Sequence, residues 1–120
     1  MADLLTLRGL TAQGRHGWFP EETERGQRFV VDLTLEVDTR AAAASDDLAD
    51  TVDYGSLASE VIALVEGEPV KLIETLADRV AALCLARDGV QRVEVTIHKP
   101  EAPVAVPFED VTLSIRRSRP

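Results

Sequence analysis

Cysteine and histidine are scarce in this chain, and their scarcity excludes whole classes of chemistry. The 120 residues include a single cysteine, Cys84, so no internal disulfide can form and a reducing compartment is favoured. A typical catalytic zinc site needs three protein ligands, usually His and Cys. The only histidines are His16 and His98, and neither lies in a His-x-His or His-x-x-x-His spacing. We therefore expect no metal and no other cofactor, and for Cys84 a packing role.

Net positive charge and long apolar runs are missing as well. The formal net charge is -8 and the sequence pI is about 4.7, which argues against nucleic-acid binding. The arginines near the C-terminus, at 116, 117 and 119, fit a solvated terminus. No apolar run approaches the roughly 20 residues of a membrane helix, and the N-terminus lacks a secretory pattern. The sequence predicts a soluble, cytoplasmic protein with neither a membrane nor a nucleic-acid partner.

Alternating hydrophobicity predicts four strands. Apolar and polar residues alternate over 29–38, 93–98 and 110–116, and more loosely over 5–10. The length suits one domain spanning residues 1–120, large enough to bury a core without disulfides or metals.

Two helices are expected between the second and third strands. Apolar residues recur at helical spacing over 57–65, where Gly67 ends the pattern, and again over 73–83 before Gly89. The predicted order is therefore ββααββ, an α+β fold with a four-stranded antiparallel sheet and both helices on one face. The short alanine run 41–44 predicts a turn or a short helical segment.

The other face of the predicted sheet carries polar residues of both charge signs. Such a face is either open to solvent, as is common for antiparallel sheets, or the lining of a water-filled tunnel shared by several subunits. The residues concerned are Thr6, Arg8, Asp32, Thr34, Glu36, Glu94, Thr96, Thr112, Ser114 and Arg116. The pattern alone leaves both readings open.

Proton transfer is the chemistry that the residue types best permit. Of the thirteen basic residues only Lys71 and Lys99 are lysines, and lysine can titrate where arginine stays charged. Lys99 ends the third strand on its apolar side, and the following Pro100 holds it extended. It fits a catalytic base, and it equally fits a strand-end lysine whose ammonium reaches water.

Three other side chains could complete a site, and each also has a purely structural reading. Glu74 opens the second helix, where the helix dipole favours a carboxylate; it could instead accept two hydrogen bonds from a fused-ring amidine. Tyr54, the only tyrosine, could pack at a helix start or relay a proton, and Asp53 before it could cap the first helix. Taken alone, Glu22 in the long first connection is an ordinary surface charge.

These positions, in their order and spacing, resemble the dihydroneopterin aldolase family over nearly the whole chain. No fragment is specific by itself, but the series is. The matching fragments are Leu7-Arg8-Gly9-Leu10, Gly14-Arg15-His16-Gly17, Glu22, Gly26-Gln27-Arg28-Phe29, Asp50-Thr51-Val52-Asp53-Tyr54-Gly55, Leu72-Ile73-Glu74-Thr75-Leu76 and His98-Lys99-Pro100-Glu101-Ala102-Pro103.

The resemblance implies a metal-independent lyase that forms no Schiff base. It would cleave 7,8-dihydroneopterin into 6-hydroxymethyl-7,8-dihydropterin and glycolaldehyde on the way to folate, with an epimerase side activity. The tunnelling fold of this family implies an octamer of two stacked tetramer rings, with the polar sheet face as the tunnel lining. Sites would lie between subunits, so Tyr54 would come from the neighbour of the chain that supplies Glu74 and Lys99.

The same resemblance assigns roles to individual residues. Lys99 would act as general acid and base, with Tyr54 protonating the enol-like carbon and Glu22 ordering the substrate side chain and a water. The pterin would be bound by a carboxylate, backbone groups and neighbouring side chains: Glu74, Ile73, Glu22, Tyr54, Val52 and Asp53. This sequence departs from common family residues at Ile73, Asp53 and Lys71, so pterin affinity and stereochemical preference are the properties in question.

The same residues allow three alternative functions. An epimerase acting on dihydroneopterin triphosphate would use a basic pocket, which Arg15, Arg25 and Arg28 could supply. An oxygenase side activity on the same substrate is another reading. A non-catalytic pterin- or purine-binding oligomer would bind ligand without releasing glycolaldehyde.

Overall fold

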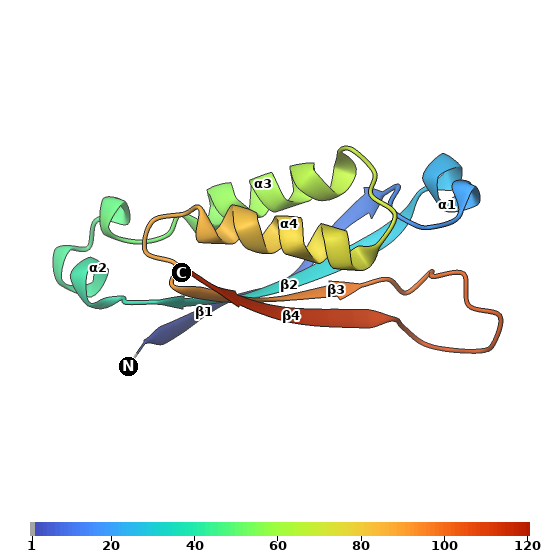
Figure 1. Cartoon of the computed structure of the whole chain (residues 1–120). Coiled ribbons are helices and arrows are strands. Elements are labelled where there is room, and N and C mark those ends of the chain that lie inside the picture. The colour runs from blue at the N-terminus through green and yellow to red at the C-terminus, as the bar shows by residue number, and fades with distance from the viewer. Residues whose placement is uncertain (1) are drawn as a thin grey trace.

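A computed structural model describes residues 2–120 and shows one sheet covered by helices on one side (Figure 1). The four antiparallel strands lie in the order β1-β2-β3-β4. They are β1 (Asp3–Gly14), β2 (Gln27–Val37), β3 (Arg92–His98) and β4 (Thr112–Ser118). The long helices α3 (Tyr54–Glu66) and α4 (Ile73–Leu85) lie between β2 and β3 in sequence and together on one face. The predicted ββααββ order and α+β class are confirmed.

The two long connections contain short helices that the periodicity did not predict in full. Helix α1 (Pro20–Arg25) lies between β1 and β2. Helix α2 (Arg40–Ser45), which includes the predicted alanine segment, and the 3-10 turn η1 (Leu48–Asp50) lie between β2 and α3. None of the helices in the described part of the chain has both the length and the apolarity to cross a membrane.

Local sequence explains why α1 forms and where it ends. Pro20 occupies the first helical turn, where its missing N–H costs nothing. The carboxylate of Glu22 accepts a hydrogen bond from the backbone N–H of Phe19 at 3.3 Å, which is one half of a capping box, since Phe19 has no side-chain acceptor for the other half. Gly26 ends the helix with a φ of +71°, a conformation that glycine adopts without steric cost. The result is a short, well-defined helix that fixes Glu22 beside the sheet.

The core lies between the sheet and the two long helices. The alternate residues Phe29, Val31, Leu33, Leu35 and Val37 of β2 are all buried. Helix α3 packs chiefly on β1, and α4 on β3 and β4. Their apolar stripes follow the predicted helical spacing and include Leu57, Val61, Val65, Leu76 and Val80. Cys84 is fully buried in this core, and burial raises the pKa of its thiol to about 11, as suits a packing role.

The loose alternation of the first strand has a structural cause. The pairing of β1 with β2 shifts between Leu7 and Leu10, which marks a β-bulge. Gly9 occupies the bulge with a φ of +77°, and its N–H donates to Asp32 Oδ1 at 2.8 Å. One extra residue in β1 therefore interrupts the period of two.

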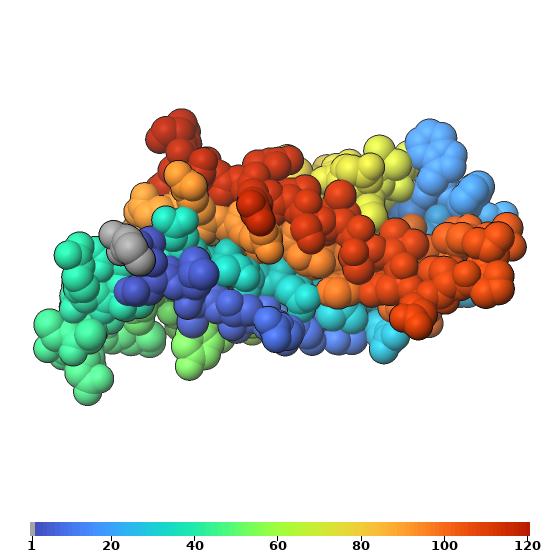
Figure 2. Space-filling model, turned by 90° about the horizontal axis from the view of Figure 1, so that it is seen from below, coloured from blue at the N-terminus to red at the C-terminus, as the bar shows by residue number. Residues whose placement is uncertain are grey.

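The face of the sheet opposite the helices carries the polar residues of the alternating strands, as predicted. Strand β1 lies along one edge and β4 along the other (Figure 2), and neither has a further strand beside it among residues 2–120. Near one end of this face His98 bridges two carboxylates: its ring nitrogens lie 2.7 Å from Asp32 Oδ2 and 2.8 Å from Asp110 Oδ2. These bonds to Asp32 and Asp110 raise the pKa of His98. Because Asp32 also accepts from the Gly9 N–H, the imidazole links the bulge of β1 and the segment before β4 to the middle of the sheet.

Candidate functional site

A buried ion pair occupies the end of the sheet where β3 finishes. Lys99 Nζ lies 2.6 Å from Glu22 Oε2, and the two residues are only 9% and 8% exposed. Lys99 follows β3 directly, and its side chain continues the buried row of Val95 and Ile97. Its ammonium therefore does not reach out to bulk water, which rules out the structural reading of a strand-end lysine solvated at its tip.

Glu22 is not the ordinary surface charge expected from its position alone. Besides the ammonium of Lys99, its carboxylate accepts from Gln27 Nε2 at 2.8 Å and from the Phe19 N–H. Burial acts to raise the pKa of Glu22, but the hydrogen bonds from Lys99, Gln27 and Phe19 outweigh it and hold the pKa below its usual value. Glu22 is thus an ionised carboxylate paired with the side chain of Lys99.

Gly17 packs directly against the carboxylate of Glu22. A Cβ built on Gly17 would overlap the carboxylate of Glu22, so any side chain there would displace it. The N–H of Gly17 donates to the carbonyl of Val70 at 2.9 Å, which ties this glycine to the segment leading into α4. Gly17, the second glycine of the Gly-Arg-His-Gly fragment, therefore leaves Glu22 the space to face Lys99.

His16 locks the turn between α3 and α4 in place. Its Nε2 donates to the carbonyl of Val65 at 2.7 Å, and its Nδ1 accepts from the N–H of Val70 at 3.0 Å. Both bonds are satisfied by the neutral ring, and burial lowers the pKa of His16 despite the bond to Val65. The ring also meets Phe29 edge to face, with centroids 5.4 Å apart. This buried histidine fixes the segment that presents Ile73 and Glu74.

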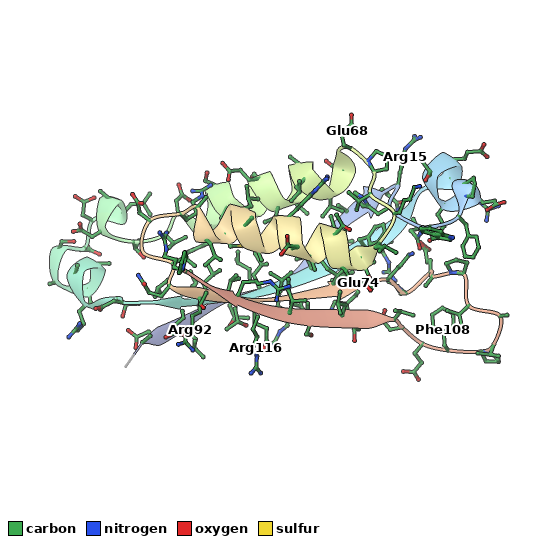
Figure 3. All side chains as sticks on the ribbon, viewed as in Figure 1. Arg15, Glu68, Glu74, Arg92, Phe108 and Arg116 are labelled. Carbon is green, nitrogen blue, oxygen red and sulfur yellow. The ribbon has the colours of Figure 1, made fainter. Side chains whose placement is uncertain are left out.

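Glu74 lies in the first turn of α4, at the same end of the molecule as α1 and the β3–β4 loop (Figure 3). Its side chain is exposed and has no hydrogen-bond or ion-pair partner among the residues that the structure describes. Ile73, half-buried, precedes it as the first residue of the helix. An exposed carboxylate in the first turn of a helix can accept hydrogen bonds from a flat, donor-bearing ring edge.

Tyr54, Asp53 and Val52 lie at the opposite end of the helix pair. Helices α3 and α4 run antiparallel (Figure 1). Each has 13 residues, and at roughly 1.5 Å per residue Tyr54 and Glu74 are separated by about 20 Å along the axis. Tyr54 is 57% exposed, while Val52 is buried. Asp53 caps α3, accepting from the Ser56 N–H at 3.1 Å, as predicted. The proposed site residues thus form two groups that cannot meet within one chain.

A hollow of about 410 Å³ opens beside Glu22 and Gln27. Its rim carries the charged side chains of Glu21, Arg25 and Glu101. A second hollow of about 440 Å³ lies on the polar sheet face near Arg92 and Arg116, which extend away from the helices (Figure 3). Only the first borders the buried ion pair. Over residues 2–120, no group of three or more His, Cys, Asp or Glu side chains is placed to hold a metal ion.

Two residues of the site, Gln27 and His16, had no assigned role before the fold was known. Both are polar and almost fully buried, at 7% and 1% exposure. The signal available was their place in fragments that resemble the family, next to the glycines Gly17 and Gly26. Gln27 orders Glu22 across five residues and His16 orders the α3–α4 turn across about fifty, and side-chain contacts of this kind leave no trace in the periodicity.

Comparisons with known proteins agree with this geometry. The family model FolB, dihydroneopterin aldolase, matches residues 5–116. A dihydroneopterin aldolase of Streptomyces coelicolor is 62% identical over 117 residues, covering 98% of each chain. The structure is similar to that of E. coli dihydroneopterin aldolase in complex with neopterin, with a TM-score of 0.87 and 33% identity over 97% of this chain and 99% of that one. It also resembles a Burkholderia thailendensis dihydroneopterin aldolase bound to guanine, with a TM-score of 0.79 and 29% identity over 99% of this chain and 93% of that one. With a family model across almost all of its length and relatives of this identity, this chain belongs to the dihydroneopterin aldolase family.

Proposed function

We propose that this protein cleaves 7,8-dihydroneopterin into 6-hydroxymethyl-7,8-dihydropterin and glycolaldehyde by a retro-aldol reaction. The observation that carries the proposal is the buried Lys99–Glu22 pair, which lies at the same end of the molecule as the Glu74 carboxylate, itself without a partner among residues 2–120. The names of the relatives and the neopterin bound to one of them support the same substrate class.

The pterin ring would be held by Glu74. Its carboxylate would accept hydrogen bonds from the ring N–H and the exocyclic amino group, a bidentate pair with high geometric specificity. The backbone at Ile73 would add a contact at the helix start. Because Glu74 has no partner within the described chain, binding need not break an existing ion pair.

The chemistry would use the ring as its electron sink. As the proton leaves the 2′-hydroxyl, the C1′–C2′ bond breaks and releases glycolaldehyde. The bonding electrons move into the ring C=N, whose nitrogen N5 takes up a proton. The resulting enol-like carbon C1′ then gains a proton and N5 loses one, so the reaction needs no added oxidant, reductant or cofactor.

Lys99 would supply and recover the protons. Its ammonium is buried and bonded to an ionised carboxylate, so a proton on this pair can pass to the substrate without crossing bulk solvent. Glu22 would order the trihydroxypropyl side chain of the substrate and a water. Tyr54 would protonate C1′.

The separation of about 20 Å between Tyr54 and Glu74 supports a site shared by two subunits. A second chain would have to bring Tyr54, Asp53 and Val52 to the Glu74 end of the first. We infer that the chain works in the cytoplasm as an octamer of two stacked tetramer rings. The open edges of β1 and β4 and the polar sheet face fit such rings, in which the face lines a tunnel.

The charges around the hollow disfavour a triphosphate substrate. Its lining includes the carboxylates of Glu21 and Glu101, the Glu22 carboxylate that Lys99 already pairs, and one arginine, Arg25. Like charges would repel a polyphosphate chain there. A purely binding role is also less well supported, because burying a lysine and a carboxylate costs free energy that ligand binding alone does not require.

The direct test is product analysis. Incubation of the protein with 7,8-dihydroneopterin under anaerobic conditions should release glycolaldehyde and 6-hydroxymethyl-7,8-dihydropterin in equal amounts. The triphosphate should turn over much more slowly. Tight binding of neopterin without any glycolaldehyde would support the non-catalytic module, and faster turnover of the triphosphate would support the epimerase.

A further inference from the structure

The first residue of β2, Gln27, is buried between the two parts of the loop that forms the candidate site. It is 7% exposed. Its Nε2 donates to Glu22 Oε2 at 2.8 Å and lies 3.4 Å from the carbonyl oxygen of His16. Gln27 thus contacts the reactive carboxylate from the side of the sheet, while Lys99 contacts the same oxygen from the end of β3.

The chemistry of its neighbours fixes the orientation of this amide. Exchanging the amide nitrogen and oxygen would put a carbonyl oxygen 2.8 Å from the Glu22 carboxylate and 3.4 Å from the His16 carbonyl. Three acceptors would then face one another with no proton between them. The orientation that donates to Glu22 is therefore the one compatible with an ionised carboxylate.

The oxygen of the same amide lacks a hydrogen bond. Gln27 Oε1 is buried and has no hydrogen-bond partner among residues 2–120. Most buried polar atoms in folded proteins are paired, and a side chain kept for packing alone would do better as an apolar residue of the same volume. An amide retained here despite an unpaired oxygen points to a task for its nitrogen.

We propose that Gln27 is a positioning residue, whose amide holds the Glu22 carboxylate against Lys99 in the geometry that proton transfer requires. Its effect on turnover rests on the function proposed above, whereas its hold on Glu22 does not. Gln27 lines the hollow beside the ion pair, but its amide nitrogen is directed at Glu22 and at the His16 carbonyl, so we assign its effect to the carboxylate.

The charged groups around Glu22 define what the loss of Gln27 would do. Lys99 faces the carboxylate from β3, the Phe19 N–H from the start of α1, and Glu21, Arg25 and Glu101 lie around the adjoining hollow. Without the amide donor, the carboxylate keeps Lys99 and the Phe19 N–H but loses a bond that favours its ionised form. Its protonation should then move to higher pH, and its orientation should loosen.

The test compares Gln27→Met, which keeps the volume but removes the donor, with Gln91→Met. Gln91 is an exposed glutamine just before β3, so it is a control for the same chemical change. Two measurements are made on each protein. The titration of the Glu22 carboxyl is followed by carbon-13 NMR with labelled glutamate, using Glu22→Gln for assignment, and glycolaldehyde release is measured from pH 4 to 9.

For Gln27→Met we expect Glu22 to titrate at higher pH than in the parent. We also expect kcat to fall about 10- to 100-fold with KM little changed, and the acidic limb of the rate profile to move upward. Gln91→Met should match the parent in every respect. If Gln27→Met does not fold, Gln27→Glu keeps the shape and replaces the donor by a second carboxylate, which must share a proton with Glu22.

An unchanged Glu22 titration in the folded variant would overturn the proposal, as would a shifted titration with unchanged kcat and profile. A parent that releases no glycolaldehyde would instead contradict the proposed aldolase function. The NMR titration would still decide whether Gln27 holds Glu22, so the two failures are distinguishable.

Discussion

The ammonium of Lys99 lies 2.6 Å from the carboxylate of Glu22, and both side chains are almost fully buried. Burying two charges costs several kcal/mol per ion before their attraction is counted, and well-packed apolar residues often replace such pairs without loss of stability. A small domain that keeps this pair at the open end of its sheet is therefore best explained by the chemistry of the pair.

The first prediction concerns the lysine. Lys99→Met should lower kcat for glycolaldehyde release by about 10²- to 10⁴-fold, because the proton donor and acceptor is lost while the apolar stem is kept. Pterin affinity, measured by neopterin titration, should change little since Glu74 remains. Lys71→Met is the comparison: Lys71 lies over the exposed ring of Trp18, and its loss should leave kcat within about twofold. Near-normal turnover by Lys99→Met would contradict the proton role.

The second prediction concerns the binding of the pterin ring by Glu74. Glu74→Gln should weaken neopterin binding by about 10- to 100-fold, because a charge-assisted bidentate contact is replaced by a neutral one. Thermal stability should not change, since Glu74 is exposed and unpaired in the described chain. Glu68→Gln, another exposed carboxylate in the turn before α4, should bind as the parent does. Equal affinity for both variants would remove Glu74 from the site.

Much of the fold was predictable because its signals are local. The alternation in β2 and the helical stripes of α3 and α4 each repeat within a few residues, and the structure follows them closely. Helix α1 was missed because six residues are too short to show a period; Pro20 and Gly26, which bound it, were its only signals. The looseness of β1 was visible, but its cause needed Asp32, which lies 23 residues further along the chain.

The candidate site was less predictable, and Glu22 shows why. Its burial depends on Lys99, which is 77 residues away in sequence, on Gln27 and on the absence of a side chain at Gly17. No local pattern encodes such a meeting, so composition alone assigns a glutamate in a long connection to the surface. Family resemblance singled out Glu22 and Lys99, and the geometry supplies the reason that they belong together.

A third prediction uses His16, which is buried as the neutral ring. Its pKa is lowered, so the unfolded chain binds a proton at a pH where the folded chain does not. The stability that His16 contributes is therefore present above about pH 6.5 and is lost as the pH falls. His16→Gln should flatten this acid-side loss, while costing about 1–3 kcal/mol at pH 7.5 through its bonds to Val65 and Val70. Denaturant unfolding at pH 5.5 and 7.5 measures both effects. If the unfolding free energy changes with pH as much in His16→Gln as in the parent, His16 is not the group responsible.

The fourth prediction concerns His98 and has the opposite sign. The bonds to Asp32 and then Asp110 outweigh burial and raise the pKa of His98, so the folded chain holds the proton more tightly than the unfolded one. The stabilisation is complete below about pH 6.5 and is lost as the pH rises through the folded pKa. Unfolding free energies between pH 6 and 9 should therefore decline less in His98→Asn than in the parent. The same decline in both proteins would assign the effect to other groups.

The central claim is that Lys99 of one chain and Tyr54 of another complete a single aldolase site, and a mixing experiment tests it most directly. Lys99→Met and Tyr54→Phe are each expected to release glycolaldehyde very slowly. Unfolded together in equal amounts and refolded, random assembly gives about a quarter of the sites both intact groups, so about a quarter of the parent rate should return. A mixture no more active than its two components, although shown to contain both chains in one oligomer, would contradict the shared site.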